Sequence, residues 1–278
     1  MSRRPAELRL GELHLEGVSR AGDETWLRVH PPGLAFDVGR GAQSLAGAHD
    51  VFLTHGHLDH ALGLPYVLSQ RTLHASRETR VFCPAEVAED LAAFVAAAAR
   101  LERVKYRWSL HPLAAGDRID VGRGLTIEAF AVDHVVPSLG FHLHRTRRPL
   151  APAYRGLPAA ELTSLRASGV EITEAIEEVW LTYSGDTGPG LFDLEPRVFS
   201  SRVLVVECTF LTEELRDHGR RFKHLHMDDL AAVADRFENE VIVLQHLSRR
   251  HTKSQLAEAV AERLPRLAAR IQFLLEGA

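Results

Sequence analysis

Residues 54–60 read THGHLDH, and this short stretch decides how the rest of the chain is interpreted. Four of its residues, His55, His57, Asp59 and His60, are potential metal ligands within six consecutive positions. Imidazole and carboxylate groups together suit zinc, iron or manganese. Burying so many polar groups is costly unless they have partners. The stretch therefore predicts a metal site rather than a chance cluster of polar residues.

The ligand spacing indicates two neighbouring metals rather than one. His55 and His57 are two positions apart, so both can face one side, whereas Asp59 and His60 follow where the chain enters a helix. Each metal needs about four ligands, so further donors are expected at other strand ends. Predicted strands do end at such donors, namely Asp133-His134 after 125–132, Asp186 after 179–183, Glu207 at the end of 203–207 and His246 after 240–245.

Apolar runs alternate with helical patterns along the whole chain, which predicts an α/β fold. No repeat or linker interrupts the pattern, so residues 1–278 are expected to form one domain. Further strands are predicted at 8–18, 25–29, 33–37, 50–54, 81–83, 117–121 and 141–144, and helices at 61–68, 85–99, 159–168, 228–238, 255–263 and 267–275.

Composition limits the cellular compartments and the binding partners that we expect for this protein. The formal net charge is -4, so contact with nucleic acid is expected to depend on local basic patches rather than on a broad basic surface. Cys83 and Cys208 do not make a disulfide framework, which favours a reducing compartment. No apolar run approaches the roughly 20 residues that span a bilayer. We expect a cytoplasmic protein without a membrane partner.

The motifs resemble those of metallo-β-lactamase-fold hydrolases, and more narrowly those of the ribonuclease Z group. THGHLDH resembles the HxHxDH signature of the fold. The match runs in order from about residue 33 to residue 252. The segments that carry it, besides 54–60, are FDVG (36–39), GLP (63–65), HVVPSLG (134–140), SGDT (184–187), VECTF (206–210) and QHLSRR (245–250).

The resemblance implies a four-layer αββα sandwich with a dinuclear metal site at one edge. It also implies the ligand sets and a supporting role for Asp37 behind the site. The metals are expected to be two divalent ions. Zinc is the preferred assignment, and manganese and iron are the alternatives. By position, His55, His57 and His134 hold one metal, Asp59, His60 and His246 hold the other, and Asp186 bridges them.

Two such metals can share a hydroxide that attacks the substrate, with Asp59 orienting or deprotonating the water. The resemblance assigns the general acid to His224, held by Glu207. His226 stands where the family usually has threonine, so His224 and His226 remain alternatives, and both could instead cap the following helix. Arg250, Ser138 and His226 are the expected substrate contacts.

The expected substrate is a phosphodiester, either at an RNA or tRNA 3′ end or in a smaller molecule. The alternative is another bond, such as a lactone, thioester or sulfate ester. Ribonuclease Z enzymes carry a long tRNA-gripping arm between the third histidine and the bridging aspartate. Here His134 and Asp186 are only 52 positions apart, and residues 170–180 are too short for that arm. Whether tRNA is processed without it stays open, as does the homodimer found in many relatives.

Overall fold

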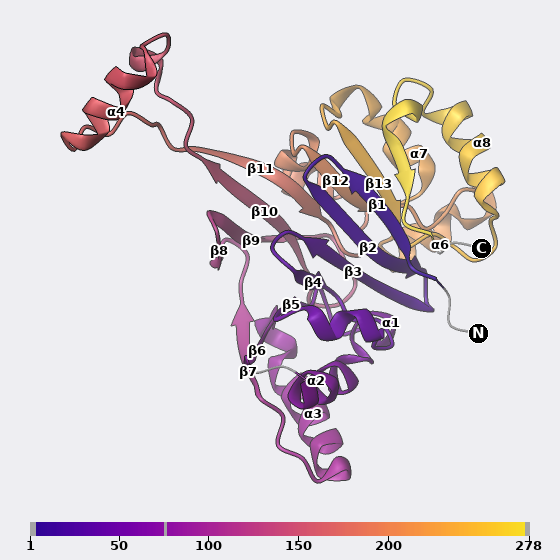
Figure 1. Cartoon of the computed structure of the whole chain (residues 1–278). Coiled ribbons are helices and arrows are strands. Elements are labelled where there is room, and N and C mark those ends of the chain that lie inside the picture. The colour runs from indigo at the N-terminus through magenta and orange to yellow at the C-terminus, as the bar shows by residue number, and fades with distance from the viewer. Residues whose placement is uncertain (1–3, 75–76, 276–278) are drawn as a thin grey trace.

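The structure is a computed structural model, and it describes residues 4–74 and 77–275. These residues form two seven-stranded sheets that pack face to face, with helices on both outer sides (Figure 1). The arrangement confirms the expected αββα sandwich. Sequence order maps onto the layers, because the first half of the chain builds one sheet and the second half builds the other.

Each sheet combines antiparallel and parallel pairs, and its strands neighbour one another in sequence order. The first sheet contains β1 Ala6–Leu10, β2 Leu13–Arg20, β3 Glu24–His30, β4 Leu34–Phe36, β5 Asp50–Phe52, β6 Thr79–Pro84 and β7 Trp108–Leu113. The second contains β8 Arg118–Gly122, β9 Leu125–Ala131, β10 Leu139–Arg147, β11 Ile176–Tyr183, β12 Val203–Glu207, β13 Val241–Gln245 and β14 Ile271–Phe273. Strands β4 to β7 pair in parallel in the first sheet, and strands β11 to β14 do so in the second. The C-terminal ends of parallel strands lie at the same edge of a sheet, and that edge carries the candidate metal site.

Apolar side chains from both sheets fill the space between them, including the stacked rings of Phe36 and Tyr183. The helices cover the outer faces and bury two further apolar clusters against the sheets. The first sheet is covered by α1 Leu58–Ala61, α2 Leu64–His74 and α3 Ala88–Glu102, and the second by α5 Leu191–Leu194, α6 Arg216–Phe222, α7 Met227–Ala232 and α8 Lys253–Arg263. Among the described residues, no helix is long and apolar enough to cross a membrane.

Some predicted elements differ from those in the structure. The predicted strand 8–18 is two strands, because a turn at Gly11 folds the chain back and pairs Leu10 with Leu13. The helix predicted at 267–275 is wrong: Ile271–Phe273 is β14, which pairs in parallel with β13. The helix predicted at 228–238 ends at Ala232 as an α-helix. Strand β7 was not predicted.

The β10–β11 hairpin departs most from expectation. Its distal half projects from the body and carries α4 Ala159–Ala167 at its tip (Figure 1). We call residues 144–179 the arm. Residues 170–180 alone are too short for a projection of this size. The paired strands β10 and β11 form its stalk, and α4 lies at its tip.

Candidate metal centre

The predicted ligands come from separate strand ends, and the fold brings them to one edge of the sandwich. His55, His57, Asp59 and His60 follow β5, the last two inside α1. The others lie in the connections after β9, β11 and β13, namely His134, Asp186 and His246. These loops converge while the sheets stay rigid, which is the usual position of a site in a layered α/β fold.

The first group comprises His55, His57, His134 and Asp186, whose ligand atoms lie within 4.8 Å of one another. The His55 Nε2 atom lies 3.0 Å from His57 Nδ1, and the His134 Nε2 atom lies 3.5 Å from the same nitrogen. In a tetrahedral zinc site with Zn–N bonds near 2.05 Å, ligand nitrogens lie about 3.4 Å apart. Both measured spacings are close to this value.

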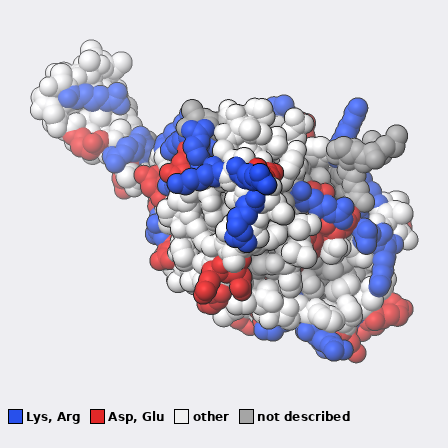
Figure 2. Space-filling model, turned by 90° about the horizontal axis from the view of Figure 1, so that it is seen from below, with Lys and Arg blue, Asp and Glu red and all other residues white. Residues whose placement is uncertain are grey.

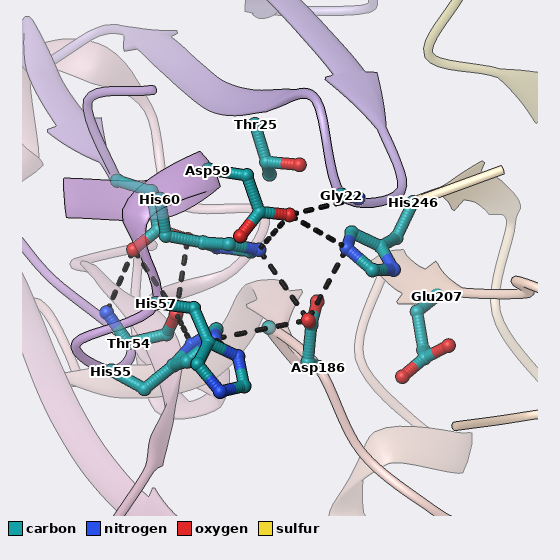
Figure 3. Close-up of polar contacts among 12 residues, drawn as sticks. Gly22, Thr25, Thr54, His55, His57, Asp59, His60, Asp186, Glu207 and His246 are labelled. Atoms are coloured by element: carbon teal, nitrogen blue, oxygen red, sulfur yellow. Dashed lines mark hydrogen bonds and ion pairs between the residues drawn. The ribbon is translucent and has the colours of Figure 1, made fainter. Parts of the chain in front are cut away.

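The second group comprises Asp59, His60 and His246. The His246 Nε2 atom lies 3.4 Å from Asp59 Oδ2 and 3.2 Å from Asp186 Oδ2. The same Asp186 oxygen lies 3.4 Å from His60 Nε2 and 3.8 Å from His55 Nε2. Asp186 thus stands between the two groups, the position of a bridging ligand (Figure 3).

The donor atoms fit a divalent metal. His60 Nε2 and Asp186 Oδ1 are buried and have no hydrogen-bond partner. Buried polar atoms without partners are uncommon in proteins and call for an explanation such as an ion. The cluster of imidazoles and carboxylates is therefore compatible with divalent metal binding.

The charges of the site point the same way. Burial alone would lower the pKa of His60, but the carboxylates of Asp186 and Asp37 raise it well above its usual value. Burial would likewise raise the pKa of Asp186, yet His246 and His60 hold it well below its usual range. Without a metal, the carboxylates draw positive charge onto buried imidazole, so the site favours a cation at its centre.

Groups behind the ligands fix their orientation. The Asp37 carboxylate is fully buried and accepts hydrogen bonds from Thr54 N, Thr54 Oγ1, Tyr183 OH and His60 Nδ1 at 2.8–3.0 Å. The bond from His60 Nδ1 leaves Nε2 free to face the cluster. Thr209 Oγ1 lies 2.9 Å from His246 Nδ1 and acts in the same way. The structure thus places Asp37 where a supporting residue was expected.

Backbone strain concentrates at this edge. Asp37 and His246 have φ values of 53° and 51°, in the left-handed region that few non-glycine residues adopt. Gly185 has φ 63°, and a Cβ there would lie 2.8 Å from Thr54 Cγ2. Only glycine lets the turn before Asp186 pack so closely against the THGHLDH segment. Strain of this kind persists where the surrounding structure enforces it, often at functional sites.

His224 lies beside both ligand groups and is held by Glu207. The His224 Nδ1 atom lies 2.9 Å from Glu207 Oε1, and the Glu207 side chain is fully buried. Burial lowers the pKa of His224, but the charge and hydrogen bond of Glu207 outweigh this and raise it to about 9. Thr187 N and Leu225 N also donate to Glu207, so the carboxylate is rigidly placed. In the metal-free chain this raised pKa favours the protonated form of His224 at neutral pH.

Two expected substrate contacts lie outside this cluster. His226 Nδ1 accepts a hydrogen bond from Asp228 N and so caps α7, and Nε2 lies 3.1 Å from Thr212 O, so both ring nitrogens are engaged. Helix capping, which was one reading of the His224–His226 pair, applies to His226 alone. Ser138 Oγ donates to Val136 O and does not line the cavity over the cluster.

An open cavity of about 800 Å³ leads to the cluster. Arg250 and Arg249 line it, together with His57, His224 and His246. Sequence reasoning missed one wall of this cavity, which consists of Phe210, His218 and Phe222. The sequence gives His218 no role, because nothing in it shows that α6 folds over the cavity.

Comparison with known proteins agrees with the site. The family described as "Beta-lactamase superfamily domain" matches residues 35–247, a range that contains all the candidate ligands. The chain is 30% identical over 266 residues to tRNase Z TRZ1 of Arabidopsis thaliana and covers 95% of each chain. Its fold resembles that of YhfI from Bacillus subtilis, with a TM-score of 0.65, 12% identity and coverage of 96% and 98%. It also resembles short-form human tRNase Z, with a TM-score of 0.58, 20% identity and coverage of 84% and 92%.

Proposed function

The chain belongs to the ribonuclease Z group of the beta-lactamase superfamily, and we propose that it is a dinuclear metal-dependent phosphodiesterase that cleaves RNA at the 3′ end of precursor tRNA. The observation that carries this proposal is the Glu207–His224 pair next to the ligand groups. A phosphodiester that releases an alcohol needs a proton for its leaving oxygen, and a positioned imidazolium can supply it. The pair and the named relatives together favour this bond over a lactone, thioester or sulfate ester.

We propose two divalent ions, zinc first, held by the two ligand groups with Asp186 between them. The donor set of imidazoles and carboxylates suits zinc, and manganese or iron are the alternatives. Such a pair of ions activates water at neutral pH and neutralises charge on phosphate oxygens.

Three residues of the chain move or hold protons in this proposal. Asp59 is ionised at neutral pH: burial would raise its pKa, but His246 and His60 lower it to about 2. Its carboxylate can therefore accept a hydrogen bond from the attacking water and orient it. His224, a cation below about pH 9, gives a proton to the leaving oxygen. Glu207 holds the His224 ring and stabilises its charge.

The substrate reaches the site through the cavity that Arg249 and Arg250 line. Both side chains are exposed, and guanidinium groups pair well with phosphate. We propose that Arg250 contacts a phosphate of the RNA beside the scissile bond.

Contact with the rest of a tRNA is proposed for the arm. Arg148 and Arg166 line a hollow at its tip. Figure 2 shows Lys and Arg on the arm and in separate groups on the body, with Asp and Glu among them on this face. Local basic patches of this kind agree with the expectation from the net charge. By contrast, Arg145 and Arg147 pair with Glu178, so these two arginines stiffen the stalk.

A homodimer is part of the proposal. Apolar side chains in and next to α1 and α2 face solvent, with exposed fractions of 65% for Leu58, 45% for Leu62 and 67% for Leu73. Rows of exposed apolar residues often mark protein interfaces. Leu73→Glu is expected to give monomers in sedimentation velocity, and an unchanged sedimentation coefficient would contradict this interface.

We propose that residues 1–278 act as one hydrolase domain, because both halves of the chain contribute to the core between the sheets. We also propose that the protein acts in the cytoplasm. Cys83 and Cys208 are free and buried, in line with a reducing compartment.

The test is cleavage of a precursor tRNA with a 3′ trailer by zinc- or manganese-loaded protein. A small chromogenic phosphodiester is the control for a working site. We expect one cut at the trailer junction. Turnover of the small ester without any cut in the precursor would overturn the tRNA substrate and keep the phosphodiesterase.

A further inference from the structure

We propose that Phe210, His218 and Phe222 form a stacking surface for a nucleobase of the substrate. We call these three residues the aromatic wall. The base is that of the nucleotide whose oxygen leaves when the phosphodiester is cut. This inference rests on the proposed function, and it adds a binding subsite for one unpaired nucleotide.

The aromatic wall and the proton donor line the same cavity. Phe210, His218 and Phe222 stand on one side of it, with His224 and His57 at its base. The Phe210 ring centroid lies 6.2 Å from that of His224. A group that stacks on the wall is therefore held next to the residue that protonates the leaving oxygen.

The His218 ring contacts the other two rings and joins them into one wall. Its centroid lies 5.5 Å from that of Phe210, with the ring planes at 90°, and 4.6 Å from that of Phe222, with the planes at 47°. Phe210 is 8% exposed and anchors the wall, whereas Phe222 is 40% exposed. His218 is exposed as well. His218 and Phe222 thus present exposed aromatic surface to the cavity.

The local backbone builds the wall and places the acid in one unit. Gly219 packs against Phe210 so closely that a Cβ would lie 2.9 Å from Phe210 Cδ2. The amide of His224 donates to Gly219 O, and the amide of Phe210 donates to Leu225 O. Helix α6 therefore carries two rings of the wall and fixes the position of His224.

The chemistry of the cavity matches a nucleotide. Proteins bind unpaired bases by stacking them on aromatic side chains, while cationic groups hold the backbone. Here the aromatic wall shares the cavity with Arg249 and Arg250. The Arg221 guanidinium also lies 5.5 Å from the Phe222 ring centroid. Apolar ring surface beside cationic groups suits a base and its phosphates.

The experiment compares two RNAs that differ only at the nucleotide carrying the leaving oxygen. One has its normal base and the other has an abasic residue. For the wild type we expect kcat/KM to fall on the order of tenfold without the base. Phe222→Leu should lose about the same factor on the normal RNA and cleave the abasic RNA as fast as the wild type.

A matched control separates stacking from a general effect of losing a phenyl ring. Tyr66 on α2 is 47% exposed and lines neither this cavity nor the second cavity at His55 and His57, so Tyr66→Leu should keep the wild-type dependence on the base. Phe222→Trp keeps an aromatic ring, so its kcat/KM should depend on the base as that of the wild type does. As a second readout, 2-aminopurine at the same nucleotide should lose fluorescence on binding to metal-free wild type, and not on binding to Phe222→Leu.

The outcomes separate the two proposals. If the wild type cuts both RNAs at the same rate, the proposed stacking surface is wrong, but the proposed nuclease function is kept. Equal losses for Phe222→Leu on both RNAs would also overturn it, because the defect would then be structural. If neither RNA is cut while a small phosphodiester is hydrolysed, RNA is not the substrate, and the proposed stacking surface is wrong as well.

Discussion

Two buried clusters of histidine and carboxylate can be compared in the described part of the chain, and they differ in whether their ligand atoms could share an ion. The first is the candidate metal centre at the sheet edge. The second, which we call the β10 cluster, lies on the outer face of the second sheet and contains His142, His144, Glu128, Glu195 and Arg197. Its histidines are as buried as those of the metal centre, with exposed fractions of 0% and 4%.

The difference lies in what neutralises the carboxylates. In the β10 cluster, Arg197 lies 2.7 Å from both Glu128 and Glu195 and supplies the positive charge. In the metal centre, Asp186 faces the imidazoles of His60 and His246. Among the described residues, ligand atoms close enough together to share an ion occur in the metal centre and not in the β10 cluster. Counting histidines and acids therefore does not identify a metal site, whereas their counter-charges and spacing do.

The largest expected effect separates the two clusters by metal content. Asp186→Ala removes the residue between the two ligand groups and should lose bound metal, with turnover down at least on the order of 1,000-fold. Glu195→Ala is the matched change in the β10 cluster and should keep both. Elemental analysis and turnover of a small phosphodiester measure this. Equal metal loss in the two variants would contradict the assignment of the metal site to the first cluster alone.

The next effect separates binding from chemistry within the metal centre. His224→Ala should retain metal and lose kcat on RNA by on the order of 100- to 1,000-fold, because the leaving oxygen loses its proton donor. On a 4-nitrophenyl phosphodiester, whose leaving group departs without a proton, the loss should be much smaller. Full activity on RNA would show that the acid is another group.

A smaller effect is expected behind the ligands. Asp37→Asn weakens the acceptor that orients His60, so zinc affinity should fall about 10- to 100-fold. Thr182→Val is the counterpart in the β10 cluster, where Thr182 Oγ1 lies 2.8 Å from His142 Nδ1. It should leave zinc affinity unchanged. Competition with a chromophoric chelator measures both, and unchanged affinity in Asp37→Asn would refute the orienting role.

The smallest effect concerns stability and pH. Burial, opposed in part by Glu195, lowers the pKa of His142 below its usual value. Protonation therefore favours the unfolded chain, so this contribution to stability is present above about pH 6.5 and is lost as the pH falls. His142→Gln removes it. Urea unfolding should show a free energy that falls less steeply between pH 6.5 and 5 than in the wild type, by at most about 1.4 kcal/mol per pH unit. Parallel curves would mean that His142 does not titrate differently on folding.

The ligand positions could be predicted because each donor directly follows an apolar strand. The sheet then brings strand ends together, so His134, Asp186 and His246 meet the THGHLDH segment although they are far apart in sequence. Asp37 also follows a strand, β4, but its supporting role was expected from the resemblance. The choice of His224 over His226 as the general acid came only from the resemblance, because the direction of each ring depends on the turn before α7.

Features set by tertiary packing could not be predicted. Ile271–Phe273 continues a helical pattern, but pairing with β13 makes it a strand. The arm was missed because a stalk of two paired strands reads like any other hairpin. His218 and Phe222 join the cavity only because α6 packs on Phe210 through Gly219. In each case a contact distant in sequence overrides the local pattern.

The most direct test of the metal centre is X-ray absorption at the zinc edge of zinc-loaded protein. The structure predicts a first shell of nitrogen and oxygen, dominated by imidazole, and a zinc–zinc distance of about 3.5–4 Å. Asp186→Ala should remove the zinc–zinc signal, and Glu195→Ala should keep it. A shell containing sulfur, or a single isolated zinc in the fully loaded wild type, would contradict a dinuclear centre at this edge.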